Sequence, residues 1–262
     1  MKRIVLTGAS GGIGRALAGR LAGPGVSMLL LARDEERLRL AAQDAREKGA
    51  EVEWVVRDVT DRGGMAAALE AWDAAAPVDL VIANAGVTAG SRPGGAPETP
   101  QDARRVWETN FVGVLNTVEP LLPALRARRG ARIALMSSMA ALRPQPDLAA
   151  YSASKAAVRA WGVALRGGLR AQGASVSVIC PGFVASPMSA RHKGFKPFEI
   201  PAERAAEIIA RGLARRDPFI TFPAPLALLT WLDNRLPAGV SDWFARGFRA
   251  EIAPDGAPQG RD

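Results

Sequence analysis

The stretch TGASGGIGR, residues 7–15, decides the fold of this 262-residue chain. It follows an apolar run at residues 3–6 that is typical of a buried strand, and a helix-patterned segment begins within it at Gly12. A turn with so few Cβ atoms lets the backbone approach an anion closely, and the start of the helix adds free N–H groups and a positive dipole end. Strand, glycine turn and helix in this order predict a pyrophosphate-binding site, the alternative being that the glycines serve only tight packing of the turn.

Short β-rich runs alternate with longer helix-patterned segments along most of the chain. Strands are predicted at residues 3–6, 27–32, 52–56, 80–83, 132–136, 175–179 and 219–222. Helices are predicted at residues 12–22, 34–48, 63–76, 100–128, 149–172 and 201–215. Crossovers of this length join parallel neighbours, so we expect an α/β protein with a Rossmann-like, doubly wound parallel sheet of about seven strands and helices on both faces. Residues 1–222 would form a single dinucleotide-binding and catalytic domain.

Two long connections rich in glycine and proline, residues 87–99 and 181–200, follow predicted strands. The ligand crevice of such a sheet lies outside the carboxyl ends of its strands. We therefore expect these connections to border the site, with residues 187–200 as the substrate loop.

Composition excludes several other classes of protein. The chain has 48% hydrophobic and 23% charged residues, which is ordinary for a globular protein. Cys180 and His192 are its only cysteine and histidine, so a disulfide and a metal site are not expected. A Ser-His-Asp hydrolase would depend on His192, which has no neighbouring motif.

The net charge of +8 raises the question of nucleic-acid binding. The 34 cations are spread along the chain, and the densest run, at residues 126–132, fits the end of a helix, so we expect no nucleic-acid partner. The chain enters a strand at its first residues and has no apolar run near the roughly 20 residues of a membrane span. We expect a cytoplasmic location.

The only tyrosine, Tyr151, is followed four residues later by Lys155 in a helix-patterned segment. Residues at this spacing share a helix face, so the Lys155 ammonium group would favour the phenolate and lower the pKa of Tyr151. The alternative is a surface pair without a role.

Arg33 ends the second predicted strand, where an acidic residue would bind a free ribose 2′-hydroxyl. Its guanidinium suits a 2′-phosphate instead, which favours NADP(H), with NAD(H) also possible. Asp34, the next residue, is expected to cap the following helix.

These motifs together resemble the compact branch of the short-chain dehydrogenase/reductase family over residues 3–188. The resemblance rests on the glycine turn, Asn84-Ala85-Gly86, Asn110, Ser138, Tyr151-x-x-x-Lys155 and Pro181-Gly182. It departs from the family pattern at Ala83, which stands for the usual asparagine, and at Ser186, which stands for the usual threonine.

The resemblance implies roles for individual residues. Tyr151 would be the general acid or base, Lys155 would grip the nicotinamide ribose, Ser138 would bind the substrate oxygen and Asn110 would position a water. The implied cofactor-binding residues are Gly8, Ser10, Gly12, Ile13, Gly14, Arg33, Asp58, Val59, Asn84, Ala85, Gly86, Tyr151, Lys155, Pro181, Gly182, Val184 and Ser186. Asp58 would hold the adenine and Asn84 the adenosine ribose.

The expected activity is hydride transfer between NADP(H) and a carbonyl or secondary alcohol of a small molecule. Met188, Phe195 and Phe198 are the predicted pocket residues and indicate an apolar substrate. Two alternatives stay open: a non-catalytic dinucleotide-sensing protein, and a nucleotide-sugar epimerase or dehydratase of the extended branch of the family.

Residues 223–262 are expected to form a helical C-terminal extension packed on the same domain. Val240, Trp243, Phe244, Phe248 and Ile252 fall at helical spacing and would form an apolar face. Packing near the substrate loop, a subunit interface and a membrane-surface helix are the three interpretations. Residues 226–252 contain three cations and three anions, which disfavours membrane contact.

The sequence also predicts self-association. Val158, Trp161, Leu165 and Leu169 form a face of the 149–172 helix opposite to Tyr151 and Lys155, and one side of the sheet is not expected to bury all four. The resemblance implies that this helix and the 100–128 helix pair across a two-fold axis. A homodimer or homotetramer is expected.

Overall fold

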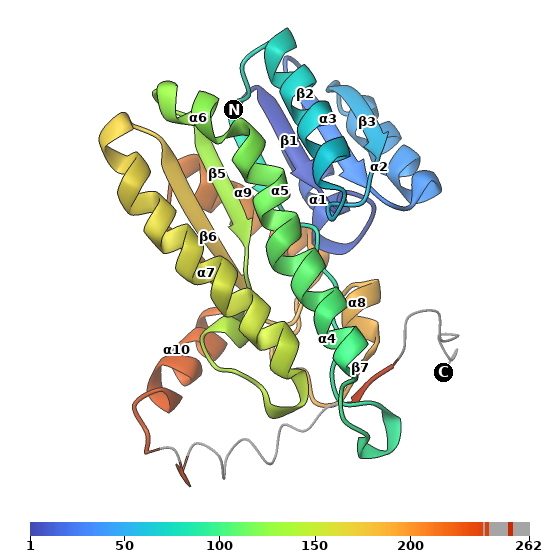
Figure 1. Ribbon diagram of the computed structural model, residues 1–262, viewed down its shortest axis with the longest axis vertical. Helices are drawn as coiled ribbons and strands as arrows, with labels where there is room; N and C mark the ends of the chain where they lie inside the picture. The colour runs from blue at the N-terminus through green and yellow to red at the C-terminus, as the bar shows by residue number, and fades with distance from the viewer. Residues whose placement is uncertain (238, 241–250, 254–262) are drawn as a thin grey trace.

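A seven-stranded parallel sheet forms the centre of the protein (Figure 1). The computed structural model describes residues 1–237, 239–240 and 251–253. The strands are β1 (Arg3–Thr7), β2 (Ser27–Ala32), β3 (Glu51–Val56), β4 (Leu80–Ala83), β5 (Arg132–Met136), β6 (Ser175–Pro181) and β8 (Phe219–Phe222). Their order is β3-β2-β1-β4-β5-β6-β8. The chain therefore runs from the central strand β1 outward to β3, returns to β4 on the other side of β1, and runs outward again to β8. This confirms the predicted α/β, Rossmann-like class.

The central strands are buried on both faces, because helices pack on both sides of the sheet. Every residue of β4 is buried, and in β1 only Arg3 is partly exposed. Leu6 of β1 is in register with Leu30 of β2 and Ile82 of β4, which places apolar side chains side by side across the sheet. This explains why these strands have continuous apolar sequences rather than alternating ones.

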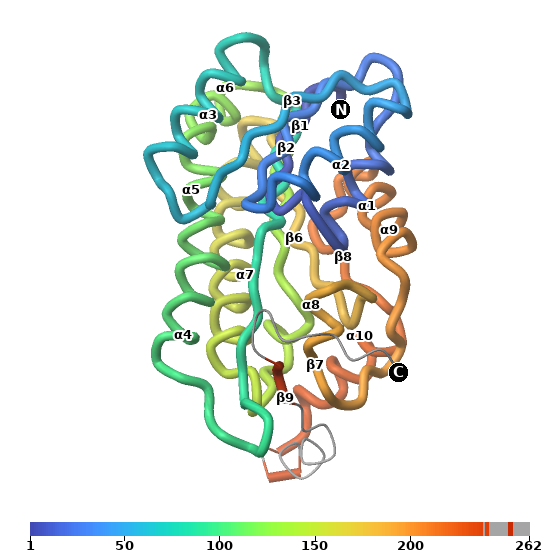
Figure 2. Tube along the Cα trace, turned by 90° about the vertical axis from the view of Figure 1, so that its right-hand side faces the viewer, coloured from blue at the N-terminus to red at the C-terminus, as the bar shows by residue number. Residues whose placement is uncertain are grey.

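The helices form one layer on each side of the sheet (Figure 2). One layer contains α1 (Gly12–Leu21), α2 (Glu35–Glu47) and α9 (Ala202–Arg215), and it encloses a core with Leu17, Leu38 and Ile209. The other layer contains α3 (Arg62–Ala75), the α4 to α6 region and α7 (Ala149–Leu169), and it encloses a second core with Met65 and Val114.

The predicted helix at residues 100–128 is divided into several segments. They are α4 (Pro100–Trp107), the π-helical η2 (Glu108–Val112), α5 (Gly113–Val118), the 3₁₀-helical η3 (Glu119–Leu121) and α6 (Leu122–Ala127). Pro120 and Pro123 lack the backbone N–H that a continuous helix requires, which accounts for the change of geometry around η3. The π turn contains Asn110, whose side chain is fully buried.

The sequence-based argument for a free apolar face on α7 is wrong. Val158, Leu165 and Leu169 are buried in the second core, and Trp161 packs against that core from a partly buried position. These side chains therefore pack on the protein's own sheet, and they give no reason to expect a subunit interface there.

Beyond β8 the chain continues as α10 (Ala224–Asp233), and farther on it forms the short strand β9 (Glu251–Ile252). This strand pairs in antiparallel fashion with β7 (His192–Lys193), which follows the short helix α8 (Pro187–Ala190). Ile252 therefore lies in a strand and not on the predicted helical face, because its backbone pairs with the loop after β6. Trp243, Phe244 and Phe248 lie outside the described residues. Within the described ranges, no helix combines the length and apolar character needed to cross a membrane.

Candidate active site

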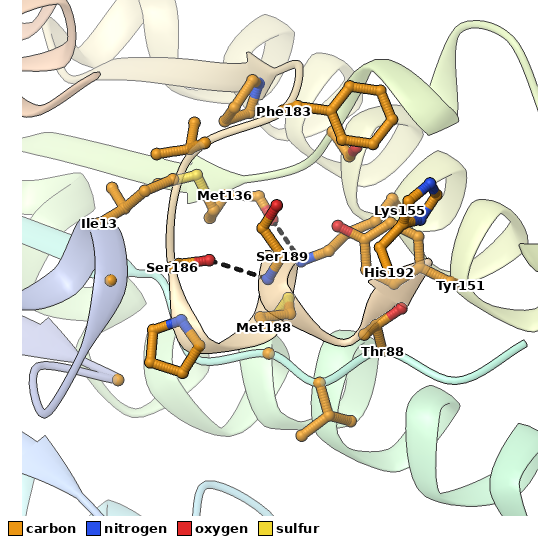
Figure 3. Close-up of a pocket in the computed structure, with 18 of the residues that line it drawn as sticks. Ile13, Thr88, Met136, Tyr151, Lys155, Phe183, Ser186, Met188, Ser189 and His192 are labelled. Carbon is orange, nitrogen blue, oxygen red and sulfur yellow. Dashed lines mark hydrogen bonds between the residues drawn. The ribbon is translucent and has the colours of Figure 1, made fainter. Parts of the chain in front are cut away.

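One cavity of about 440 Å³ lies at the carboxyl ends of the central strands. At one end it is lined by the glycine turn and Arg33, and at the other by Ser138, Tyr151 and Lys155. Figure 3 shows Ile13 and Tyr151 on opposite sides of it. Of the predicted cofactor-binding residues, those that line this cavity are Gly8, Ser10, Gly12, Ile13, Gly14, Arg33, Asn84, Gly86, Tyr151, Lys155, Pro181, Gly182, Val184 and Ser186.

The glycine turn has no room for side chains at two of its positions. Gly8 has a φ of +65°, and a Cβ atom there would lie 2.8 Å from the Cα of Ala85. A Cβ on Gly14 would lie 2.0 Å from the carbonyl oxygen of Gly8. A Cβ on Gly11, by contrast, would meet nothing within 4 Å. Gly8 and Gly14 therefore allow the turn to fold against β4, and the start of α1 faces the cavity.

Asn84 and Thr7 hold the glycine turn against the end of β4. The Asn84 amide nitrogen Nδ2 donates to the carbonyl oxygens of Thr7, at 3.0 Å, and Gly8, at 3.1 Å. The Thr7 hydroxyl accepts from the backbone N–H of Asn84 at 3.1 Å. The side-chain amide of Asn84 therefore binds the turn, and its contact with a ribose stays a prediction.

Lys155 is buried beneath Tyr151, with a side chain only 3% exposed. Its Nζ donates to the carbonyl oxygen of Met136 at 2.9 Å, the contact dashed in Figure 3, and lies 5.8 Å from the centroid of the Tyr151 ring. Burial lowers the pKa of Lys155 to about 8, because the ammonium ion loses solvation.

Tyr151 and Ser138 line the same end of the cavity, and the Ser138 side chain is close enough to influence the pKa of Tyr151. Burial raises the pKa of Tyr151, and the nearby Ser138 hydroxyl lowers it by less. The net direction is opposite to the one we expected from Lys155, because desolvation of the phenolate dominates. The Tyr151 hydroxyl is therefore protonated at neutral pH, and it is suited to donate a proton.

Asn110 is fixed by the loop that follows β4. Its Oδ1 accepts from the backbone N–H of Val87 at 2.8 Å, and its Nδ2 donates to the carbonyl oxygen of Val87 at 2.9 Å and to the Ser154 hydroxyl at 3.1 Å. A Cβ on Gly86 would lie 3.2 Å from both Asn110 Oδ1 and Lys155 Nζ, so the two side chains border the same glycine. A water between them stays a prediction.

Arg33 and Asp58 flank a second, smaller hollow beside the glycine turn, together with Val59 and Ala85. Nη1 of Arg33 lies 3.6 Å from Oδ2 of Asp58, and the Arg33 side chain is 60% exposed. Asp34 accepts from the backbone N–H of Arg37, which confirms it as the N-cap of α2.

The comparisons with known proteins agree with this geometry. Residues 2–195 match the family described as short chain dehydrogenase. The chain belongs to the short-chain dehydrogenase family. It is 36% identical over 247 residues to an uncharacterized oxidoreductase of Myxococcus xanthus, a match that covers 94% of this chain and 96% of the relative.

Solved structures of this family superimpose on the chain. A short chain dehydrogenase/reductase from Burkholderia phymatum in complex with NAD has a TM-score of 0.78 at 27% identity, covering 89% of this chain and 92% of that one. An alcohol dehydrogenase from the archaeon Thermococcus sibiricus, complexed with 5-hydroxy-NADP, has a TM-score of 0.72 at 26% identity, covering 85% and 96%. The chain is thus an NAD(P)-dependent oxidoreductase of the short-chain dehydrogenase family.

The substrate end of this short-chain dehydrogenase differs from our expectation. Met188 lines the cavity, but Phe195 and Phe198 do not belong to its lining and are 66% and 49% exposed. The sequence placed them in the pocket because they lie in the loop after β6, whereas the loop directs its later residues outward.

Several residues around the cavity were missed by the sequence analysis. Those at the substrate end are Thr88, Gln145, Leu148, Phe183, His192, Leu226 and Ile252, and those at the adenosine end are Arg37 and Arg57. His192 is 7% exposed, packs edge-on against the Phe183 ring and lies on the Tyr151 side of the cavity (Figure 3). Burial is the main cause that lowers its pKa, so this histidine is neutral at pH 7. Thr88, Phe183 and Arg57 lie shortly after predicted strands, which was the available signal, whereas Arg37, Leu226 and Ile252 lie in predicted helical segments and gave no signal.

Proposed function

We propose that this short-chain dehydrogenase is an NADP(H)-dependent carbonyl reductase or secondary-alcohol dehydrogenase in which Tyr151 is the general acid or base. The observation that supports this most directly is the single cavity whose lining includes both the glycine turn and the pair of Tyr151 and Ser138. Lys155, buried beside that pair, completes the set.

The residues present fit a nicotinamide dinucleotide. The glycine turn and the start of α1 bring backbone N–H groups to the cavity, and Pro181, Gly182, Val184 and Ser186 line the same cavity, with Ser186 beside Gly12. The Burkholderia phymatum relative with bound NAD supports the same class of cofactor. When bound, a reduced nicotinamide supplies a hydride to a carbonyl carbon.

The proton chemistry belongs to the protein's own residues. Negative charge develops on the carbonyl oxygen during reduction, and the Tyr151 hydroxyl would donate its proton to that oxygen. The Ser138 hydroxyl would donate a hydrogen bond to the same oxygen. Lys155, when protonated, would offset the negative charge left on Tyr151. Oxidation of an alcohol uses the same groups in reverse, with Tyr151 accepting the proton.

The preference for NADP(H) over NAD(H) is supported by the charges at the adenosine end. Arg33 extends into solvent from the end of β2 and lines both the cavity and the smaller hollow. Arg37 also lines the cavity, and Arg57 also lines the smaller hollow. The strand ends with Ala32 and not with a carboxylate that would repel a 2′-phosphate. Asp58 lies 3.6 Å from Arg33, a contact long enough to leave guanidinium N–H groups for a phosphate, whereas Arg57 is paired with Asp61 at 2.9 Å.

The substrate we propose is a small, largely apolar carbonyl compound or alcohol. Leu148, Phe183, Leu226 and Ile252 contribute apolar side chains to the lining of the cavity. Thr88 and His192 are polar groups at the same end and would contact a second polar group of the substrate.

Two further expectations accompany this function. We propose that residues 1–222 act as one domain and that the chain forms a homodimer or homotetramer. Light scattering tests the second: a mass near that of the 27.6 kDa monomer at micromolar concentration would refute it.

A panel assay tests the proposed function. Purified protein is mixed with NADPH or NADH and a series of aldehydes, ketones and quinones, and loss of the reduced nicotinamide is followed by absorbance. We expect turnover with at least one apolar carbonyl compound and faster reaction at limiting NADPH than at equal NADH. Tight NADPH binding without turnover of any member would instead support a dinucleotide-sensing protein.

A further inference from the structure

The C-terminal strand β9 joins two loops across the mouth of the cavity. One loop follows β4 and contains the 3₁₀ turn η1 (Pro93–Gly95), and the other follows β6 and contains β7. Figure 2 shows β9 beside β7, at the end of the molecule where the strands of the sheet present their carboxyl ends. Arg191 and Ala253, 62 residues apart in sequence, are brought into contact here.

Backbone hydrogen bonds connect β9 to both loops. The N–H of Ile252 donates to the carbonyl oxygen of Ser91 at 2.7 Å, and the N–H of Ala253 donates to that of Arg191 at 2.9 Å. Nε of Arg191 donates in return to the carbonyl oxygen of Ala253 at 2.8 Å. The strand therefore bridges the two loops and does not pack on one of them alone.

The Glu251 side chain adds a third connection. Its Oε1 accepts from the backbone N–H groups of Gly94, at 3.0 Å, and Gly95, at 3.2 Å. Both glycines have positive φ, so consecutive N–H groups of this turn point toward the same carboxylate. Glu251 thus anchors the tip of the loop after β4.

Ile252 points the opposite way, as the next residue of a strand must. It is 3% exposed and lines the cavity together with Leu148 and His192. A Cβ on Gly90 would lie 2.7 Å from Cδ2 of Leu148 and 3.0 Å from Cγ1 of Ile252, so both side chains pack on this glycine. Leu148 immediately precedes α7, the helix that holds Tyr151.

We propose that Ile252 is a specificity-determining residue that limits the size of the substrate, and that Glu251 is a positioning residue that holds it there. This proposal rests on the proposed function. Ile252 forms an apolar wall of the cavity, and its strand β9 is hydrogen-bonded to both loops. A substrate with a longer carbon chain would fit only if β9 separated from one of these loops, so the wall excludes such substrates. One methylene group in an apolar pocket changes specificity by roughly tenfold or more.

The first experiment measures kcat/KM for a series of straight-chain 2-ketones of increasing length. Ile252→Ala should move the preferred chain length upward, with roughly a tenfold gain for a ketone too long for the wild type. Ile252→Phe should move it downward. The changes should appear mainly in KM, and the NADPH dissociation constant should stay near the wild-type value. Lys193→Ala, in the exposed residue of β7, is the matched control and should keep the wild-type preference.

The second experiment does not require turnover. Deuterium exchange of the loop after β4 is measured with NADPH bound, in Glu251→Ala and in the conservative Glu251→Gln, which keeps an acceptor oxygen. Exchange at Gly94 should rise roughly fivefold in the alanine variant, which is the effect of losing one net hydrogen bond, and stay near the wild-type rate in the glutamine variant. The N–H of Gly95 also donates to the carbonyl oxygen of Arg92 at 3.0 Å, so its exchange should change less.

The outcomes separate the two ideas. If the wild type reduces no ketone or other carbonyl compound of the panel, the proposed function fails, and the size-limiting role of Ile252 fails with it. If turnover occurs and the three Ile252 forms share one chain-length preference, the proposed function stands and the role of Ile252 is overturned. Equal exchange in Glu251→Ala and the wild type overturns the positioning role in either case.

Discussion

Replacement of Lys155 by methionine should stabilise the protein while it removes activity. The ammonium group is buried, and its pKa falls from 10.5 to about 8 in the folded state. At about 1.4 kcal/mol per pKa unit, this interval corresponds to a cost of about 3 kcal/mol for keeping the side chain charged in the folded protein. Methionine keeps the apolar stem and loses the hydrogen bond to the Met136 carbonyl, which offsets about 1 kcal/mol. We expect a net gain of about 2 kcal/mol, or roughly 4 to 8 °C in Tm.

The stability difference between Lys155→Met and the wild type should depend on pH. The folded state binds a proton at Lys155 less tightly than the unfolded state does, so the cost is present in full below pH 8. It disappears as the pH rises from about 8 to 10.5, where the side chain becomes neutral in both states. The advantage of Lys155→Met should therefore be largest at neutral pH and vanish above pH 10.5.

Urea unfolding of the protein without cofactor measures the free energy at neutral and at alkaline pH. Lys193→Met, at an exposed position, is the control and should change stability little. A Lys155→Met variant that is less stable than the wild type at neutral pH would refute the reasoning. It would mean that the buried ammonium group stabilises the folded protein, whereas we expect its desolvation to destabilise it.

Three further predictions concern the same cavity. Arg33→Asp should weaken NADPH binding by roughly ten- to hundredfold, because charge-assisted hydrogen bonds to the 2′-phosphate would be lost. Binding of NADH should change little, and titration with both cofactors measures the two effects. Gly14→Ala should raise the NADPH dissociation constant and lower the free energy of unfolding by about 1 to 3 kcal/mol, because its Cβ would lie 2.0 Å from the Gly8 carbonyl oxygen. Gly11→Ala, with open space at its Cβ, should do neither, and equal effects of the two would contradict the packing argument. The kcat/KM for carbonyl reduction should decline as the pH rises through about 8, where Lys155 loses its proton, and a rate that stays level up to pH 10 would exclude a requirement for the ammonium form.

The sequence predicted the sheet well, because each strand is a short apolar run bounded by turn residues. The run at Leu80–Ala83 is a clear example, since four apolar residues between two helix-patterned segments are too short for a helix and favour a central strand, which the structure shows buried at every residue. The glycine turn and the Tyr151 and Lys155 pair were likewise predictable, because their spacing along the chain fixes their relation in space.

Features that depend on distant contacts could not be predicted in this way. Ile252 was assigned to a helical face, and only its pairing with His192 places it in a strand at the cavity. Phe195 and Phe198 are apolar but exposed, because the path of a loop is not set by hydropathy. The raised pKa of Tyr151 depends on how completely the surrounding chain excludes water from the phenol, which spacing alone does not reveal.

The most direct test of hydride transfer with Tyr151 as the proton donor is the turnover of Tyr151→Phe. This variant keeps the ring and removes the hydroxyl group, so NADPH binding, followed by fluorescence titration, should be unchanged. Single-turnover oxidation of NADPH by the best carbonyl substrate of the panel should slow by roughly a hundred- to ten-thousandfold, as is typical for the loss of a general acid. A Tyr151→Phe variant that binds NADPH normally and reacts at more than half the wild-type rate would contradict the assignment.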